Sequence, residues 1–399
     1  MYIYLLCSMN NPKGTIVIIA ILLAVVIPAG ASHVDMRVAR LLSGEILQQA
    51  EKNLTEEPVT VTATKAIRSA GGIHDFYSEG DYWWPDPKNP EGPYIRRDGQ
   101  TNPDNFTAHR HAMVRLSQIV GNLTSAYLLT NDQRYIDAIV SHLKAWFINP
   151  QTLMNPHLLY GQAIKGVVTG RGIGIIDTLQ LIEVAQSVWL LHQIGALPKT
   201  CFEGVRKWFT DYLQWMTTHP YGVSEMNATN NHGTCWAVQA AIFAKLTGNQ
   251  EVMQLCRDRF KQIFMPKQMA SDGSFPQELA RTKPYSYSLF NLDAMAALCE
   301  ILSTPGESLW QYKTSDGKTM RKAVDFICPY IKDKNSWPYP HDVMYWEEWP
   351  VAQPAILFAW RQFGDQRYWE AWAPFNHFPT HEEVIRNLPI RNPLIWLYK

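Results

Sequence analysis

The sequence predicts an all-α protein, an (α/α) toroid or incomplete barrel of repeated helical hairpins. From residue 104 onward, apolar residues recur at helical spacing in long segments separated by Gly, Pro and Asn turns. The same pattern, a helix end followed by a tight turn and a new helix, occurs three times at intervals of 117 residues. The three segments are LLTNDQRYIDA from Leu128, KLTGNQEVMQL from Lys245 and QFGDQRYWEAW from Gln362. Comparable breaks fall about halfway, near Gly195 and Gly306. Hairpins that cannot bury their own apolar faces must stack on neighbours, and a toroid satisfies this requirement.

The expected helices follow one another without a strand-rich segment of comparable length between them. We therefore expect residues 32–399 to form a single toroidal domain, with the longer loops gathered at one end to carry the functional site. In chain order the expected helices span residues 106–129, 133–147, 175–194, 202–217, 235–246, 251–264, 287–302, 318–332, 351–363 and 367–372.

The composition is that of a globular protein with a sizeable core. Of the 399 residues, 46% are hydrophobic and 18% are charged, which excludes a disordered chain. The formal net charge is zero, so no nucleic-acid partner is expected. Tryptophan and tyrosine are abundant, and many lie beside Pro or Gly in expected loops, where flat rings can support sugars.

The first 31 residues have the pattern of a secretory signal peptide. Lys13 precedes an apolar run over residues 16–27, and the small residues Ala29, Gly30 and Ala31 follow it. We expect cleavage after Ala31 and a periplasmic or secreted protein with no stable membrane partner, because the run is short for a membrane span. An uncleaved anchor is the alternative, and Met9 is an alternative start.

Cysteine and histidine spacing gives no sign of a metal site. The five cysteines after residue 31 are odd in number and widely spaced, so we expect small core residues rather than disulfides or zinc ligands. His109 and His111 are two positions apart, which places them on different faces of a helix. No metal and no organic cofactor is therefore expected. These cysteines are Cys201, Cys235, Cys256, Cys299 and Cys328.

Asn231 and His232 begin one of the expected helices. They follow Thr229 and Asn230 and precede a mostly apolar segment, which is the pattern of a helix N-terminus. Backbone N–H groups and the positive end of the helix dipole favour an anion at such a position. We expect Asn231 and His232 to act there and Asn230 to contact the substrate. The alternative is that Asn231 only caps the helix and His232 is a satisfied polar residue.

A second polar stretch, residues 273–293, carries Arg281, Tyr285 and Tyr287 just before another helix. Together with Asn231 and His232, these side chain types can neutralise a carboxylate and move a proton beside it. The sequence therefore indicates acid–base chemistry next to an anionic group.

Two loops offer further substrate-binding candidates. The first, residues 81–97 (DYWWPDPKNPEGPYIRR), contains Trp84 and Arg96 and is either a cleft wall for a charged sugar or a surface lap packed on helices. The second, residues 160–177, places Gln162 and Arg171 among five glycines. It lacks the Gly-Lys-Ser/Thr end of a phosphate-binding loop, so we expect a mobile lid or substrate subsite.

A third loop, residues 337–350 (WPYPHDVMYWEEWP), is dense in aromatic residues. We expect His341 and Tyr345 to contact the substrate. The alternative is that the aromatic rings only pack between two helices.

Three motifs together carry a family resemblance: NNHG at a helix start, RTKPYSYSLFNL about 50 residues later, and the early DYWWPDP. In this combination the chain resembles the alginate lyase superfamily of (α/α)-toroid polysaccharide lyases, most closely polysaccharide lyase family 38. The resemblance covers roughly residues 75–360. The chain leaves no room for the C-terminal β-sheet domain of the larger members.

The resemblance implies β-elimination on a uronic-acid polysaccharide, with alginate as the first candidate substrate. It implies that Asn231, His232 and Arg281 neutralise the C5 carboxylate and that Tyr287 is the catalytic tyrosine, because Tyr287 matches the Tyr-x-x-aromatic-x-Leu context. The family pattern does not exclude Tyr285 as the catalytic tyrosine. With Tyr287 as the catalytic residue, we expect Tyr285 to bind the substrate.

The chemistry can also be argued without the family. A proton next to a carboxylate becomes acidic only when the carboxylate's charge is neutralised, which Asn231, His232 and Arg281 are suited to do. Tyrosine titrates near 10, so we expect a nearby cation, Arg281, to lower the pKa of the base, Tyr287. For mannuronate Tyr287 could serve as both base and acid, whereas for guluronate His232 would be the base.

Other functions share this pattern. A glucuronan lyase would use the same four residues, and a noncatalytic uronan-binding protein would keep the cleft without the reaction. A glycoside hydrolase would use paired carboxylates. The sequence does not distinguish endo from exo action or indicate the oligomeric state. The carboxylates available near the expected loops are Glu225, Glu278, Glu347 and Glu348.

Overall fold

The structure is a computed structural model, and it describes residues 6–7, 19–20 and 34–398. Most of the expected signal peptide, including the cleavage position after Ala31, lies outside the described residues. The helices are α1 Met36–Asn53, α2 Ala108–Thr130, α3 Gln133–Phe147, α4 Leu181–Gln193, α5 Lys199–Thr218, α6 Pro220–Met226, α7 Asn231–Thr247, α8 Gln250–Arg259, α9 Pro276–Leu279, α10 Pro284–Leu302, α11 Met320–Lys332, α12 Pro354–Phe363, α13 Gln366–Glu370, α14 Glu382–Arg386 and α15 Pro393–Leu397.

Short strands and tighter helical turns fill the connections. The strands pair as β1 Leu6–Cys7 with β2 Ile19–Ala20, β3 Tyr77–Glu79 with β6 Tyr160–Ala163, and β4 Trp83–Trp84 with β5 Ile95–Arg96. The 3₁₀ turns are η2 Val61–Ala63, η3 Gly172–Gln180, η5 Leu309–Gln311, η6 Lys334–Ser336 and η7 Trp346–Glu348, and η4 Phe260–Gln268 is a π-helix.

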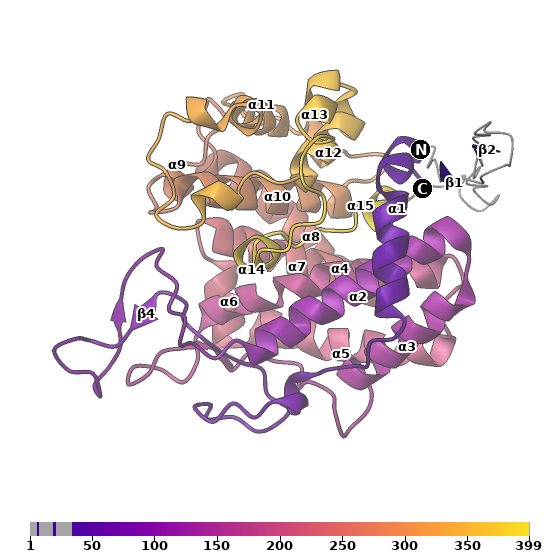
Figure 1. The fold of residues 1–399 in the computed structure, drawn as a ribbon. Coiled ribbons are helices and arrows are strands. Elements are labelled where there is room, and N and C mark those ends of the chain that lie inside the picture. Colours follow the sequence, from indigo (N-terminus) through magenta and orange to yellow (C-terminus); the bar gives the residue numbers. More distant parts are fainter. Residues whose placement is uncertain (1–5, 8–18, 21–33, 399) are drawn as a thin grey trace, which may run out of the picture.

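The helices form an incomplete (α/α) toroid, as the sequence predicts. An inner series runs α2, α4, α7, α10 and α12, each in contact with the next, and each is followed by an outer helix. The inner helices α7 and α10 are buried on nearly all sides, whereas the outer helices α3, α5 and α11 bury a single face. Figure 1 shows the later hairpins stacked above the earlier ones. The stacking of hairpins on neighbours therefore creates the core.

The repeated sequence breaks form one kind of turn. α2, α7 and α12 each end at a residue with left-handed backbone conformation, Asn131, Gly248 and Gly364. An Asp or Asn side chain then caps the next helix by accepting a backbone N–H. The predicted hairpins at these positions are confirmed, and the third of the expected helices is divided, with η3 preceding α4.

The two ends of the described domain pack against each other, and sequence periodicity missed both. α1 packs on α2, and α15 packs on α1, α2 and α4, so the chain returns to its beginning (Figure 1). Arg391 and Asn392 donate backbone N–H groups to the buried carboxylate of Glu183 on α4. The C-terminal segment is thus held by buried polar contacts as well as by apolar packing.

The five predicted core cysteines are buried and form no disulfide, which confirms that expectation. One described helical stretch, Gly172–Gln193, is long and apolar enough to span a membrane, but 83% of its most apolar window is buried inside the protein. That burial is typical of a core helix in a globular protein.

Candidate active site

A cavity of 230 Å³ lies at the N-terminal ends of α7 and α10. Its lining gathers the residues predicted as catalytic with several predicted as substrate-binding, although they are spread over some 200 positions of the sequence. The lining residues are Asp81, Tyr82, Trp83, Arg96, Gln162, Arg171, Ile173, Ile176, Asn230, Asn231, His232, Arg281, Tyr287, Phe290, Arg386 and Asn387.

The start of α7 is fixed by a cap and by a close backbone approach. Asn230, not Asn231, is the cap, and its side chain accepts the N–H of His232. Gly233 follows within the first turn, where an added Cβ would lie 2.1 Å from the carbonyl oxygen of Ala228. A side chain at Gly233 would therefore displace the start of the helix. This close approach accounts for the glycine of NNHG, and the cap leaves Asn231 as the first residue of the helix.

Asn231 is clamped by Glu278, a buried residue of α9. Its backbone N–H donates to one carboxylate oxygen at 2.8 Å, and its side-chain Nδ2 donates to the other at 2.5 Å. Burial raises the pKa of Glu278, although these hydrogen bonds oppose the shift. One N–H of the Asn231 amide is used in this clamp, so its second N–H is the donor that can serve a ligand.

His232 is held by Glu225, a buried residue of α6. Its Nδ1 lies 2.6 Å from Oε1 of that carboxylate. Burial works against a charged imidazole, but the adjacent carboxylate and its hydrogen bond outweigh burial and raise the pKa of His232 above its ordinary value. The ring is therefore favoured as a cation whose Nε2–H can donate to an anion in the cavity.

Arg281 is already engaged by a carboxylate of the protein. Its Nη2 lies 3.1 Å from Oδ1 of Asp98, which also accepts a hydrogen bond from Thr282. Partial burial opposes ionisation, yet the hydrogen bonds from Arg281 prevail and lower the pKa of Asp98 to about 2. The guanidinium thus holds Asp98, which directly follows the 81–97 loop, beside the cavity. An incoming carboxylate would share Arg281 with Asp98.

Tyr287 pairs with a second tyrosine that the sequence did not single out. The hydroxyl oxygens of Tyr82 and Tyr287 are 2.5 Å apart, and Nη2 of Arg281 lies 3.4 Å from the Tyr287 hydroxyl. Burial and Tyr82 raise the pKa of Tyr287 well above its ordinary value, while Lys283 and Arg281 offset only part of this shift. The expected lowering of the Tyr287 pKa is therefore wrong, because burial outweighs the cations.

Buried ion pairs made by the C-terminal segment support the part of the cavity that contains Tyr82 and Tyr287. Nζ of Lys283 lies 2.5 Å from Oε1 of Glu383 on α14, and Arg386 pairs with Asp81, which also binds Arg110. Lys283 is only 2% exposed and lies beside the rings of both Tyr82 and Tyr287. The short helix α14 therefore fixes a cation next to the tyrosine pair.

Removing Glu383 should destabilise the fold, because it would leave the ammonium of Lys283 buried without its partner. We expect Glu383→Ala to lower the free energy of unfolding by about 3–5 kcal/mol in urea denaturation. The matched control is Glu382→Ala, since the neighbouring carboxylate is 81% exposed and should matter by less than about 1 kcal/mol. Equal effects of the two substitutions would contradict a structural role for the buried pair.

Four predicted substrate-binding residues line the cavity, namely Arg96, Gln162, Arg171 and Asn230. The glycines of the 160–177 loop lie where backbones pack closely. An added Cβ at Gly174 would lie 2.6 Å from Gly161, for example. Close packing therefore explains these glycines without a mobile lid.

The other predicted substrate-binding residues lie outside this cavity. Tyr285 is fully buried, donates its hydroxyl to the carbonyl of Tyr330, and packs against tryptophans. The indole of Trp84 donates to the carbonyl of Gln100, and its neighbour Trp83 lines the cavity instead. His341 stacks on the indole of Trp346 at 4.0 Å.

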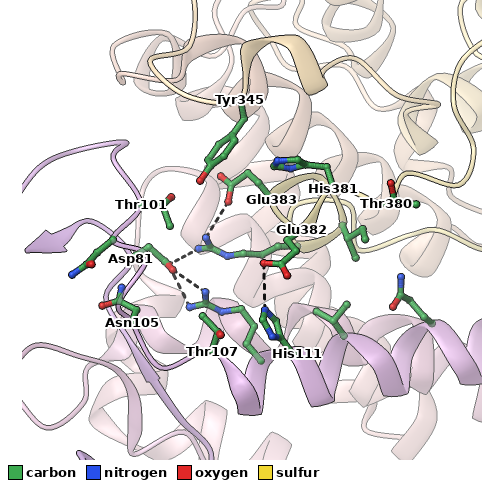
Figure 2. A pocket seen from close by; sticks show the side chains of 16 residues that line it. Asp81, Thr101, Asn105, Thr107, His111, Tyr345, Thr380, His381, Glu382 and Glu383 are labelled. Atoms are coloured by element: carbon green, nitrogen blue, oxygen red, sulfur yellow. Dashed lines mark hydrogen bonds and ion pairs between the residues drawn. The ribbon is translucent and has the colours of Figure 1, made fainter. Parts of the chain in front are cut away.

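Tyr345 lines a larger neighbouring cavity of 570 Å³, which meets the first at Asp81 and Arg386. Figure 2 shows Tyr345, His381 and Glu383 around it, with dashed lines marking the ion pairs that converge on Asp81. None of the four predicted catalytic residues lines this larger cavity. Within residues 34–398, no three His, Cys, Asp or Glu side chains are grouped so that they could hold a metal ion.

Comparison with known proteins gives a consistent result. Residues 60–337 match the model of the family described as alginate lyase. The structure is similar to a crystal structure of an alginate lyase from Bacteroides ovatus, with 33% identity, a TM-score of 0.78, and coverage of 90% of this chain and 93% of that one. Curated protein sequences give no significant match.

More distant structures share the fold. Alginate lyase A1-III from Sphingomonas species A1 is 18% identical, with a TM-score of 0.52 and coverage of 86% of this chain and 90% of that one. A variant of alginate lyase A1-III complexed with a tetrasaccharide is 15% identical, with a TM-score of 0.53 and coverage of 85% and 90%.

Proposed function

The chain belongs to the alginate lyase family, and on this premise we propose that it is a polysaccharide lyase that cleaves alginate by β-elimination. The observation that carries the proposal is the grouping of Asn231, His232, Arg281 and Tyr287 in one cavity. Elimination breaks the C4–O4 bond of a uronate, forms a C4–C5 double bond, and leaves a 4,5-unsaturated end on one product.

Three of these side chains can neutralise the substrate carboxylate. The imidazolium of His232, the guanidinium of Arg281 and the second amide N–H of Asn231 all lie at the cavity wall. Hydrogen bonds and positive charge at the carboxylate stabilise the charge that develops when the proton on C5 is removed. The carboxylates of Glu225 and Glu278 act through these groups by fixing their orientation, so we assign them as positioning residues.

Tyr287 is placed to move the proton. As a phenolate it would accept hydrogen bonds from the hydroxyl of Tyr82 and from Arg281, which is the support that a buried negative charge needs. The phenolate takes H5, then returns that proton to O4 as the C4–O4 bond breaks, and is thereby regenerated. Because the pKa of Tyr287 is raised, the phenolate population grows with pH, and we expect the rate to increase with pH until His232 loses its charge.

This arrangement favours mannuronate as the unit cleaved. In mannuronate H5 and O4 lie on the same side of the ring, so one tyrosine can serve both. A guluronate route would need neutral His232 as the base, whereas the Glu225 carboxylate favours its charged form. Poly-mannuronate is therefore proposed ahead of poly-guluronate. Glucuronate has the same configuration as mannuronate at C4 and C5, so only the match to the alginate lyase family supports mannuronate over glucuronan.

Replacing Tyr82 tests the proposed support of the phenolate. Tyr82→Phe removes one hydrogen bond to a charged group, so we expect kcat to fall by about tenfold to a hundredfold with little change in KM. Steady-state kinetics on poly-mannuronate measure both. The control is Tyr312→Phe, since that hydroxyl donates to the carbonyl of Lys261 and does not line the cavity. An unchanged kcat in Tyr82→Phe would rule out this role.

A hydrolase is less consistent with the lining. Hydrolysis needs two carboxyl groups flanking the scissile bond. Glu225 and Glu278 are buried and bound to His232 and Asn231, whereas Glu347 and Glu348 are exposed and lie outside the cavity lining. The one carboxylate in the lining, Asp81, pairs with Arg110 and Arg386.

Mass spectrometry of the oligosaccharide products tests the reaction class. Elimination adds no water, so each cleavage should yield one product lighter by one water than the corresponding hydrolysis product. Products that all carry the mass of saturated oligosaccharides would contradict the proposal and support hydrolysis. No cleavage of any uronan, with binding retained, would support the noncatalytic alternative.

We also propose that the protein is exported to the periplasm or secreted. The support is the pattern of residues 1–31 alone. After expression of the full chain in a Gram-negative host, we expect the exported protein to begin at Ser32, which N-terminal sequencing measures. Recovery of the intact N-terminus in the membrane fraction would support the uncleaved anchor instead.

A further inference from the structure

A second polar cavity lies at the opposite ends of the helices that carry the active site. It has a volume of 440 Å³ and is lined by the C-terminal parts of α4, α7, α10 and α12 and by α15. Along α7, Lys245 in this cavity is 14 residues beyond Asn231, about 21 Å at the rise of an α-helix. The cavity is thus separate from the site described above, and the proposed elimination does not use it.

Two buried polar groups in this lining have no hydrogen-bond partner among the residues that the structure describes. Gln186 is 5% exposed and Trp396 is 7% exposed, and Oε1 of the first and Nε1 of the second are unpartnered. The Gln186 amide has a fixed orientation because its Nε2 donates to the carbonyl of Ile395 at 2.9 Å. Buried polar groups are nearly always paired, so this acceptor and this donor point to a polar ligand.

The charged groups of the cavity form no close ion pair among the described residues, although the charge of Glu300 acts on both Lys245 and Arg361. Among the described residues, no carboxylate lies within ion-pair distance of Lys245 or Arg361. The ammonium of Lys245 lies 3.5 Å from the ring centroid of Trp189, and burial lowers the pKa of Lys245 to about 8. Glu300 accepts the indole N–H of Trp310 through Oε1, which leaves Oε2 for another donor.

Donors, acceptors and indole rings around a space of this size match the chemistry of a sugar ring. Each sugar hydroxyl both donates and accepts. The hydroxyls can therefore donate to the acceptors Gln186 and Glu300 and accept from the donors Lys245, Arg361 and Trp396. The volume lies within the range of small-molecule pockets. We propose that this cavity binds one pyranose unit, at a site distinct from the active site.

A compact inorganic anion suits this cavity less well. The carboxylate of Glu300 lines it, and the negative ends of four helix dipoles point toward it. The pyranose could be a neutral hexose or a hexuronate, because both present the same ring hydroxyls. They differ in whether Lys245 and Arg361 also receive a carboxylate.

Calorimetric titration of the full protein with D-mannose, D-mannuronate and inorganic phosphate tests the proposal. We expect at least one sugar to bind, and Lys245→Met and Glu300→Gln each to weaken that binding about tenfold through loss of a charged hydrogen bond. Binding of mannuronate alone would identify a carboxylate-reading site, and binding of both sugars would identify a ring-reading site. Preferential binding of phosphate, or no binding of either sugar, would overturn the proposal.

Matched variants separate this cavity from the active site. Lys207→Met, on the exposed face of α5, should leave sugar binding unchanged, and so should Arg281→Ala. Loss of binding in Arg281→Ala with retention in Lys245→Met would place the sugar in the active site and refute the second site.

A measurement on the unmodified protein does not depend on whether the variants fold. In the unmodified protein, sugar should shift the indole N–H resonance of Trp396 in ¹⁵N NMR spectra, with that resonance assigned from Trp396→Phe. An unshifted resonance at a sugar concentration that saturates the calorimetric signal would refute the site. The outcomes for the variants of Lys245, Glu300 and Trp396 do not bear on the elimination reaction, because these three residues lie outside the active-site lining.

Discussion

Tyr287→Phe should reduce kcat on poly-mannuronate by about a thousandfold or more, because it removes the hydroxyl that takes H5 and returns the proton to O4. KM should change little, since the ring and its contact with Arg281 remain. Steady-state kinetics measure both constants, and circular dichroism checks the fold. The Tyr82 hydroxyl would lose the hydroxyl it contacts at 2.5 Å.

The control for this prediction lies two residues earlier on the same helix. Tyr285→Phe makes the same chemical change at a fully buried hydroxyl that donates to the carbonyl of Tyr330. We expect it to lower the free energy of unfolding by about 1 kcal/mol and to leave kcat within about twofold. If Tyr285→Phe lost activity and Tyr287→Phe kept it, the assignment of the catalytic tyrosine would be reversed.

Glu225→Gln should reduce kcat/KM at neutral pH by about a hundredfold, because His232 would lose the carboxylate that orients it and favours its charged form. The direction of this effect follows from the pKa of His232. In the unmodified protein the raised pKa keeps His232 charged to a higher pH than an ordinary histidine, and without the carboxylate the imidazole should become neutral at lower pH. NMR titration of labelled histidine, with His232 assigned from His232→Gln, measures the shift.

Glu203→Gln is the matched control, since Glu203 lies on the surface of α5 and is 59% exposed. It should change neither the titration of His232 nor kcat/KM. If Glu225→Gln lowered activity while the pKa of His232 stayed unchanged, Glu225 would have only a structural role. If activity were unchanged, the proposed role of charged His232 in neutralising the substrate carboxylate would be wrong.

The toroid could be predicted from sequence because its signals are local. Asn131, Gly248 and Gly364 each follow an apolar helix and precede a capping Asp or Asn, so three hairpins can be identified without tertiary information. α1 and α15 were missed, because α1 lies before the expected repeat and α15 is a single short turn. Their positions depend on packing against α2 and on the buried contacts of Glu183.

The candidate catalytic residues could be selected by residue type and family motif, but their partners could not. Glu225, Glu278 and Tyr82 contact His232, Asn231 and Tyr287 through space. Nothing in periodicity or spacing pairs Tyr82 with a residue 205 positions away. For Tyr82, its place in DYWWPDP was a usable signal, because that motif contributed to the family resemblance.

Burial explains why two expectations from the sequence were wrong, namely the exposure of Tyr285 and the direction of the Tyr287 pKa shift. The family context favours Tyr287 over Tyr285 without excluding Tyr285, and helix geometry turns Tyr285 toward tryptophans in the core and Tyr287 toward the cavity. The sequence analysis predicts a lowered pKa for Tyr287 because a base must be usable near neutral pH, with Arg281 supplying part of the shift. Burial is the larger influence, and its size depends on the fold.

The central claim is elimination on a mannuronate-containing uronan by Tyr287, and ultraviolet absorbance tests it most directly. The purified mature protein and its Tyr287→Phe variant are mixed separately with poly-mannuronate, poly-guluronate and glucuronan, and the absorbance of the conjugated double bond is followed. We predict a rise with poly-mannuronate that is lost in Tyr287→Phe. No rise with any polymer while new reducing ends accumulate, or a rise that persists undiminished in Tyr287→Phe, would contradict the account.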